Sequence, residues 1–182
     1  MNDTPLTGKQ SPDKAVERPW WQREVFAERL PALEVRNQVT RATRQLFSEH
    51  EFVEVETPAI QLSPGTEPHL TAFETQIFEP FAMDRGRPLY LQTSPEFTMK
   101  KLLTAGMKKI FQLARVWRNG ERSSTHHPEF TMLEWYRAGA GWRDIAGDCE
   151  VMIRRVLLES CSDEEPITVR WRGLVCDPFS NW

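Results

Sequence analysis

The chain has 182 residues, of which 40% are hydrophobic and 27% charged, and its net charge is −3. This composition is ordinary for a globular domain with a substantial core. It gives no general electrostatic case for binding nucleic acid, since such domains carry an excess of Lys and Arg. No apolar run approaches the length of a membrane span, and no apolar signal-peptide core follows Met1. We therefore expect a cytoplasmic protein that does not contact a membrane.

The cysteines predict neither disulfides nor a metal centre. Cys149, Cys161 and Cys176 are odd in number, scattered, and form no CxxC pair. Reduced thiols are the simple interpretation, as in most cytoplasmic proteins.

The N-terminal part of the chain is expected to lie outside the main domain. Residues 1–19 are polar, hold three prolines and predict a flexible tail. Residues 20–30 favour a short helix, which Pro31 ends. We therefore divide the chain into residues 1–31, a tail with a short helix, and residues 32–182, the main domain.

The main domain begins with a predicted helix over residues 32–50, because apolar side chains recur on one helical face. These side chains are Val35, Val39, Ala42 and Leu46. Residues 51–60 alternate between valine and glutamate and predict a strand closed by Pro58. Residues 71–78 predict another strand, and residues 80–88 a turn-rich connection.

A second predicted helix follows a short buried strand at residues 89–92 and is expected to end at Gly106. Ser94 is a good N-cap, Pro95 suits the first helical position, and Glu96 favours the positive helix start. These capping roles explain the residues well. The functional alternative is that Glu96 meets an ammonium group of a substrate at the junction of strand and helix.

Residues 110–136 predict strand, polar loop and strand, with turn-forming residues at 119–128. Side chains of the second arm alternate between two faces. One face carries Phe130, Met132, Glu134 and Tyr136, and the other Thr131, Leu133 and Trp135. A half-buried hairpin with a solvated loop fits this pattern. A floor for adenine and a small cationic substrate also fits it, with Arg118, His126 and His127 facing phosphate.

The C-terminal part predicts an amphipathic helix over residues 143–160 and the start of a strand at residues 167–171. The buried stripe of the helix consists of Ile145, Cys149, Met152 and Val156. We interpret this stripe as packing rather than as a cofactor site.

Several motifs in order resemble one family. WRN at residues 117–119 and HHPEFTMLEWY at residues 126–136 resemble motif 2 of the class II aminoacyl-tRNA synthetases, in its lysine-branch form. The long helix, short strand and Pro58 resemble motif 1, and SPEF at residues 94–97 resembles the amino-acid pocket of lysine ligases. Within the family the sequence is most similar, over roughly residues 32–160, to the short lysyl-tRNA synthetase paralogues that modify elongation factor P.

The resemblance implies an α+β fold, in which helices flank a class II antiparallel sheet. It implies a ligase that forms lysyl-adenylate from ATP and lysine or β-lysine, and transfers the lysyl group to elongation factor P. A homodimer formed through motif 1 is implied as well. Mg²⁺ would bridge the phosphates, but the sequence does not locate its ligands, so no metal-binding residue is predicted.

The resemblance also assigns residues to two sites. It places Ser94, Pro95, Glu96 and Tyr136 in the substrate pocket, and Arg118, Asn119, Gly120 and His127 at ATP. The residue pattern adds Glu134 as an acceptor for an ammonium group and Phe130 as a ring that stacks on adenine. Arg118 is the predicted catalytic residue, because a planar, permanently charged guanidinium suits a phosphate oxygen.

One position departs from the family pattern. Lysine enzymes commonly have Glu directly after Arg-Asn, whereas here Gly120 stands there and Glu121 comes one residue later. We therefore expect contact with adenine from the backbone of Asn119 and Gly120 rather than from a side chain at this position.

Two expected absences bear on function. No Gly-rich strand and helix resembling motif 3 lies in residues 137–182, so we expect an incomplete catalytic domain with weak or no activity alone. The roughly 30 residues before the motif 1 helix are too few for an anticodon-binding barrel, so tRNA is not an expected partner. The alternatives are a fragment of a tRNA-charging lysyl-tRNA synthetase, or a non-catalytic module that binds nucleotide or protein.

Overall fold

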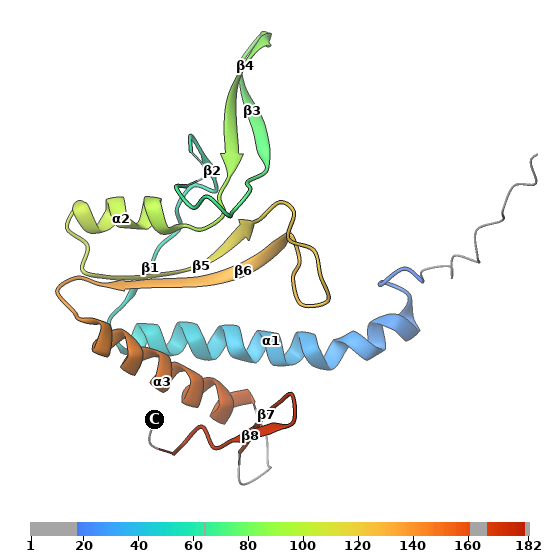
Figure 1. Cartoon of the computed structure of the whole chain (residues 1–182), viewed down its shortest axis with the longest axis vertical. Helices are drawn as coiled ribbons and strands as arrows, with labels where there is room; N and C mark the ends of the chain where they lie inside the picture. Colours follow the sequence, from blue (N-terminus) through green and yellow to red (C-terminus); the bar gives the residue numbers. More distant parts are fainter. Residues whose placement is uncertain (1–17, 64, 161–166, 181–182) are drawn as a thin grey trace, which may run out of the picture.

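The computed structural model describes residues 18–63, 65–160 and 167–180. Within these ranges the helices are α1 (Arg23–Glu49), α2 (Glu96–Thr104) and α3 (Trp142–Ser160). The strands are β1 (Val53–Glu54), β2 (Ile60–Gln61), β3 (Glu74–Glu79), β4 (Ala82–Leu91), β5 (Lys109–Trp117), β6 (Glu129–Arg137), β7 (Val169–Trp171) and β8 (Leu174–Cys176). Figure 1 shows their arrangement, an α+β fold.

The central sheet has the order β1-β5-β6, with β1 parallel and β6 antiparallel to β5. The register pairs Lys109 with Arg137 at one end and Trp117 with Glu129 at the other. The predicted strand–loop–strand unit at residues 110–136 is therefore confirmed. The predicted strand at residues 51–60 is shorter than expected, because only Val53 and Glu54 pair with β5.

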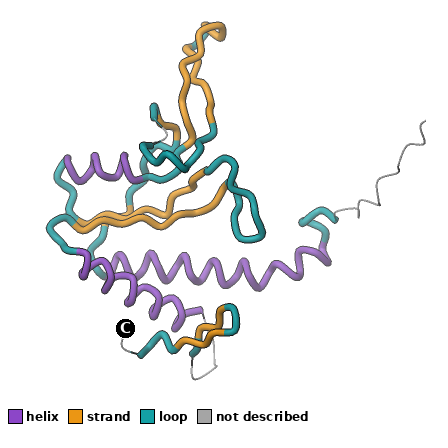
Figure 2. The backbone as a smooth tube through the Cα atoms, viewed as in Figure 1, coloured by secondary structure: helices purple, strands orange, loops and turns teal. Residues whose placement is uncertain are grey.

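Helices cover both faces of this sheet: α2 lies on one face, and α1 and α3 lie on the other (Figures 1 and 2). A core cluster of Phe47, Phe52 and Phe111 lies on the α1 side, where Leu133 and Trp135 of β6 pack against it. The alternation predicted for β6 is thus observed. Apolar side chains on alternate positions face α1, which leaves the other positions to face α2.

The second sheet corrects one expectation. Its order is β2-β4-β3, and β3 and β4 form a long antiparallel hairpin that projects from the body (Figure 1). Residues 82–88 belong to β4, so a turn-rich connection over residues 80–88 was wrong except at Pro80 and Phe81. Pro88 is tolerated because at this point β4 pairs only with Gln76 of β3, while β2 reaches only Tyr90 and Leu91.

Helix α1 also differs from expectation, because it continues through Pro31. A proline inside a helix removes one backbone hydrogen bond and bends the helix, but the turns on either side still form. Figure 1 shows α1 changing direction towards its N-terminal end. The predicted division of the chain at residue 31 therefore does not coincide with the end of a helix. Ala42 and Leu46 are buried as expected, whereas Val35 is 45% exposed.

The remaining expectations on the fold have mixed outcomes. Helix α3 is confirmed, but its predicted buried stripe is only half-buried. Strand β7 pairs with β8 as a hairpin. Cys149 and Cys176 are free thiols, while Cys161 and the predicted tail at residues 1–17 lie outside the described residues. Across the described ranges, no helix has the length and apolar character that crossing a membrane requires.

Candidate active site

A cavity of about 300 Å³ opens where β4 runs into α2, beside the α2-facing side of β6. It lies on the opposite side of the central sheet from the aromatic core. The residues that line it are Gly65, Glu67, Leu70, Thr93, Ser94, Glu96, Phe97, Arg118, Met132 and Glu134. Three carboxylates, those of Glu67, Glu96 and Glu134, and the guanidinium of Arg118 therefore surround this space.

The start of α2 positions two of these residues. The helix begins at Glu96, and Pro95 takes the N-cap position, so the start lies one residue later than expected. The Ser94 hydroxyl nevertheless accepts a hydrogen bond of 3.1 Å from the Glu96 amide. Pro95 is fully buried, and its carbonyl accepts from the Met99 amide. Buried Met99, rather than Phe97, anchors the helix, since Phe97 is 47% exposed.

Glu134 is the centre of a hydrogen-bond network on the floor of the cavity. The Ser94 hydroxyl donates to Glu134 Oε2 at 3.0 Å, and the Tyr136 hydroxyl donates to Glu134 Oε1 at 2.6 Å. Both donors are neutral, so they fix the orientation of the carboxylate without cancelling its charge. Burial, reinforced by the hydrogen bond and charge of Glu134, raises the pKa of Tyr136 well above 10.0.

Glu96 has a different kind of partner. Its carboxylate forms an ion pair with the ammonium group of Lys100, one turn further along α2. The hydrogen bond that Lys100 donates to Glu96 and the negative charges of Glu96 and Glu134 raise the pKa of Lys100. Glu134 and Glu96 are therefore held by opposite means, the first by neutral hydroxyls and the second by a cation.

Arg118 lies at the rim of the cavity, where its guanidinium has three neighbours. Its Nε donates to the Thr93 carbonyl at 3.4 Å, and Glu121 lies 3.9 Å from its terminal nitrogen. The guanidinium also stacks over the ring of Phe130, 5.3 Å from the centroid. These contacts hold a permanent cation beside the cavity, and the guanidinium covers one face of the Phe130 ring.

The loop between β5 and β6 brings fewer predicted residues to the cavity. The backbone N–H of Asn119 donates to the Thr71 carbonyl at 2.7 Å, so this donor already has a partner within the chain. Gly120 is exposed at φ 82°, and a Cβ there would meet nothing within 4 Å. His127 Nδ1 contacts the Glu129 backbone, and His126 Nδ1 contacts the hydroxyls of its own loop. Neither histidine lines the cavity.

The structure thus gathers part of the predicted site. Ser94, Glu96, Arg118 and Glu134 line one cavity, Tyr136 is bonded to Glu134, and Phe130 lies under Arg118. Asn119, Gly120 and His127 stay in the loop, and Pro95 is buried beneath the helix start. Sequence reasoning missed Lys100 and Glu121. The spacing of four residues between Glu96 and Lys100 on one helix was the signal that could have identified the first.

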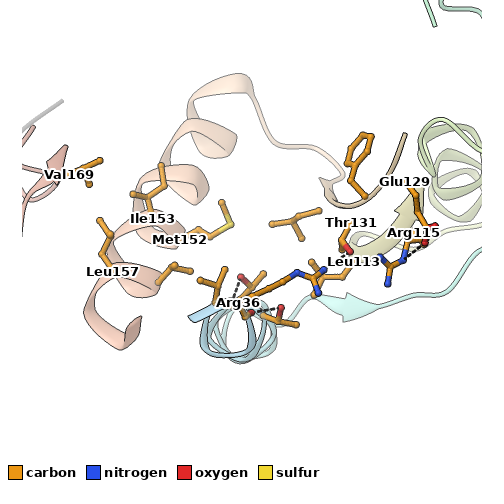
Figure 3. Close-up of a pocket in the computed structure, with 15 residues that line it drawn as sticks. Arg36, Leu113, Arg115, Glu129, Thr131, Met152, Ile153, Leu157 and Val169 are labelled. Carbon is orange, nitrogen blue, oxygen red and sulfur yellow. Dashed lines mark hydrogen bonds and ion pairs between the residues drawn. The ribbon is translucent and has the colours of Figure 1, made fainter. Parts of the chain in front are cut away.

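A larger cavity lies on the other face of the sheet, between α1, β5, β6 and α3 (Figure 3). Its volume is about 870 Å³, and its lining is mostly apolar. Arg36 reaches across from α1 and donates to Thr131 at 2.8 Å, and Arg115 pairs with Glu129. Apart from Phe130, no residue of the predicted site lines this space. We therefore locate the candidate active site at the start of α2.

Comparisons with known proteins identify the family of the chain. The family model of class II tRNA synthetases (D, K and N) matches residues 21–177. An elongation factor P–(R)-β-lysine ligase of Haemophilus ducreyi is 42% identical over 132 residues, 72% of this chain and 38% of the relative. The ligase of the same name from Sodalis glossinidius is 39% identical over 158 residues, 82% of this chain and 48% of the relative.

A third ligase of this name, from Pseudoalteromonas translucida, is 47% identical over 110 residues, 60% of this chain and 34% of the relative. The chain spans less than half of the length of each of these three relatives. The family model covers most of the chain and includes both arms of the hairpin and the helix start that form the cavity. The chain belongs to the class II tRNA synthetase family of the D, K and N group.

Proposed function

We propose that this chain carries the amino-acid site and part of the ATP site of a ligase that activates lysine or (R)-β-lysine and transfers it to elongation factor P. The relatives named above support the reaction and the acceptor. The observation that carries the proposal is the network in which Ser94 and Tyr136 orient Glu134, in the same cavity as Glu96.

The cavity suits a substrate with two ammonium groups. A cation is tolerated in a partly buried site only when it is paired and hydrogen-bonded. The two donors to Glu134 are neutral hydroxyls, so they do not cancel the charge of its carboxylate. Glu96 supplies a second carboxylate on the same wall. Lysine and β-lysine each carry two ammonium groups and one carboxylate, so one carboxylate is available for each ammonium group.

The proposed activation step joins the carboxylate of the amino acid to ATP. A carboxylate oxygen attacks the α-phosphorus, the bond to the bridging oxygen breaks, and pyrophosphate leaves with that electron pair, which gives an acyl-adenylate. Such a step needs in-line positioning and charge neutralisation around phosphorus more than proton transfer. Arg118 supplies a permanent positive charge at the rim of the cavity, next to the Phe130 ring that we propose for adenine.

The proposal assigns smaller roles to the loop. The Asn119 carbonyl and the Gly120 backbone are proposed to contact the edge of adenine, since the Asn119 amide is engaged with Thr71. His127 is proposed to reach the distal phosphates. Across the described ranges, no group of three or more His, Cys, Asp or Glu side chains could hold a metal ion. ATP is normally bound together with Mg²⁺, which is therefore part of the proposal.

Cellular setting and assembly are part of the same proposal. The free thiols of Cys149 and Cys176 suit the reducing cytoplasm. Exposed apolar side chains near the start of α1, among them Trp21, Leu33 and Val35, support a homodimer formed through this helix. Sedimentation velocity at rising protein concentration tests this assembly, and a monomer at high concentration would argue against it.

The first test of the proposal is Glu134→Gln. We expect lysine affinity to fall by roughly 10- to 100-fold, because a charge-assisted hydrogen bond is lost. ATP affinity should stay nearly constant. Glu129→Gln is the matched control, since Glu129 lies on the same strand but pairs with Arg115 outside this cavity. Isothermal titration calorimetry measures both ligands. Equal lysine affinity in the Glu134→Gln variant and the wild type would refute the site.

Transfer of the lysyl group is tested separately. Elongation factor P is incubated with this protein, ATP and either amino acid, and its intact mass is then measured. A mass increase by one lysyl group supports the proposed acceptor. Lysine attached to tRNA instead would favour a tRNA-charging enzyme. Unchanged ATP affinity in Arg118→Ala would favour a non-catalytic binding module, because the ligase proposal places this guanidinium at the phosphates.

A further inference from the structure

The carboxylate of Glu96, which we propose for an ammonium group of the substrate, is already engaged by an ammonium group of the chain itself. Lys100 lies one helical turn beyond Glu96 on α2, and its Nζ pairs with Glu96 Oε1. The side chain of Lys100 is 54% exposed, and that of Glu96 is 35% exposed. Glu96 is therefore bound by an ammonium group, the same group that a lysine substrate carries at the end of its side chain.

This ion pair differs from an ordinary surface pair on a helix, because one partner belongs to the cavity. Glu96 lines the cavity together with Glu134, whereas Lys100 does not line it. The negative charge of Glu134 also acts on the ammonium group of Lys100 and helps to keep it protonated. Lys100 therefore lies in the field of both carboxylates that we assign to the substrate.

Without a cation nearby, the neighbouring carboxylates of Glu96 and Glu134 would be unfavourable in the empty cavity, since like charges in a partly buried site repel each other. Ser94 and Tyr136 cannot relieve this repulsion, because both are neutral donors to Glu134. Arg118 is held at the rim by the Thr93 carbonyl, Glu121 and the Phe130 ring. Lys100 is the cation that neutralises one of the two carboxylates from outside the cavity.

We propose that Lys100 is an internal competitor for one ammonium group of the substrate, holding Glu96 while the cavity is empty and releasing it when lysine or β-lysine binds. This inference rests on the proposed function. Binding then exchanges one ammonium group for another at Glu96, and the Lys100 side chain moves into solvent, to which it is already half exposed.

The exchange lowers substrate affinity by a small factor. Exposed ion pairs spaced four residues apart on a helix are weak, so the competitor is easily displaced. Removing the charge of Lys100 should therefore tighten lysine binding by roughly 3-fold. A role in positioning Glu96 would have the opposite effect, because loss of Lys100 would then leave Glu96 misplaced and weaken binding.

The experiment titrates free L-lysine into the wild-type chain and three variants by isothermal titration calorimetry at low ionic strength. Lys100→Met removes the ammonium group and keeps most of the side-chain volume. Lys100→Arg keeps a cation that binds carboxylates at least as well. Lys101→Met is the matched control, because it makes the same charge change at an exposed position next to Lys100. Circular dichroism confirms that each variant is folded.

We expect the Lys100→Met variant to bind lysine about 3-fold more tightly than the wild type. The Lys100→Arg variant should bind no more tightly, and the Lys101→Met variant should be unchanged. Weaker or equal binding by Lys100→Met would overturn the inference. Equal tightening in Lys101→Met would overturn it too, since net charge alone would then explain the gain. If no folded variant binds lysine, the proposed function itself fails, and that outcome is distinct from the others.

Discussion

The carboxylates of Glu134 and Glu96 in the candidate site differ in the charge of the groups that bind them. Glu134 receives two hydrogen bonds from neutral hydroxyls, whereas Glu96 is paired with the cation of Lys100. Neutral donors orient a carboxylate without cancelling its charge, and this is what a site for a cationic ligand requires. The orientation of Glu134 therefore depends on Tyr136 staying protonated.

Tyr136 is expected to ionise only at a pH well above 10.0. Burial and the acceptor Glu134 raise the pKa of its phenol in the folded state, so folding favours the protonated form. The stabilisation from this preference is complete below the unfolded pKa and is lost as pH rises towards the folded pKa. Ultraviolet absorbance of the Tyr90→Phe variant follows Tyr136 alone, since the chain has 2 tyrosines. Phenolate formation at the ordinary pKa would contradict the prediction.

At the scale of elements, α3 lies with α1 on one face of the central sheet. This helix contains a glycine at a position that has room for a side chain. Met152 of α3 packs against the aromatic core, so the helix contributes to the stability of the whole unit. Gly147 lies inside α3, and a Cβ there would meet nothing within 4 Å. Glycine inside a helix lowers stability, because it loses more backbone freedom on folding than alanine does.

We expect Gly147→Ala to raise the free energy of unfolding by roughly 0.5–1 kcal/mol. The matched control is Gly139→Ala, at the turn after β6, where φ is 79°. An alanine in this left-handed conformation is strained, so this control should lose about 1 kcal/mol. Urea denaturation measures both changes. Destabilisation by Gly147→Ala would show that the methyl group does not fit beside the helix.

At the scale of the whole molecule, one aromatic cluster joins elements that are distant in the sequence. Phe47 of α1 stacks on Phe111 of β5, with ring centroids 4.7 Å apart. It also meets the edge of Phe52 at 4.9 Å and the ring of Trp135 at 5.7 Å. The cluster therefore fixes α1 against the central sheet, whose opposite face carries the candidate site.

Phe47→Ala is expected to lower the free energy of unfolding by about 3–5 kcal/mol, because it removes a buried ring and leaves a cavity. Phe81→Ala is the control. Phe81 is 105% exposed at the tip of the β3–β4 hairpin, so its loss should change stability by less than about 0.5 kcal/mol. Thermal and urea denaturation compare the two variants. Similar losses in both would show that the aromatic cluster is not the main core.

The sequence by itself determined which side chains of β6 share a face and which family the chain belongs to. The alternation of β6 placed Glu134 and Tyr136 on the face opposite Leu133 and Trp135, because side chains of a strand point to opposite faces in turn. The motifs also identified the family, which the match over residues 21–177 confirms. Both depend on local order in the chain, which the sequence records directly.

Only the tertiary structure decided which distant residues meet. Ser94 bonds to Glu134, 40 residues away, because α2 and β6 lie against each other in the folded chain. Local patterns carry no information on such pairing, nor on the β3–β4 register that makes residues 82–88 a strand. Pro31 likewise looks like a helix boundary from its chemistry, yet the turns on either side continue α1 through it. In the first two cases long-range packing outweighs local preference, since the energy of burial and pairing exceeds that of propensity.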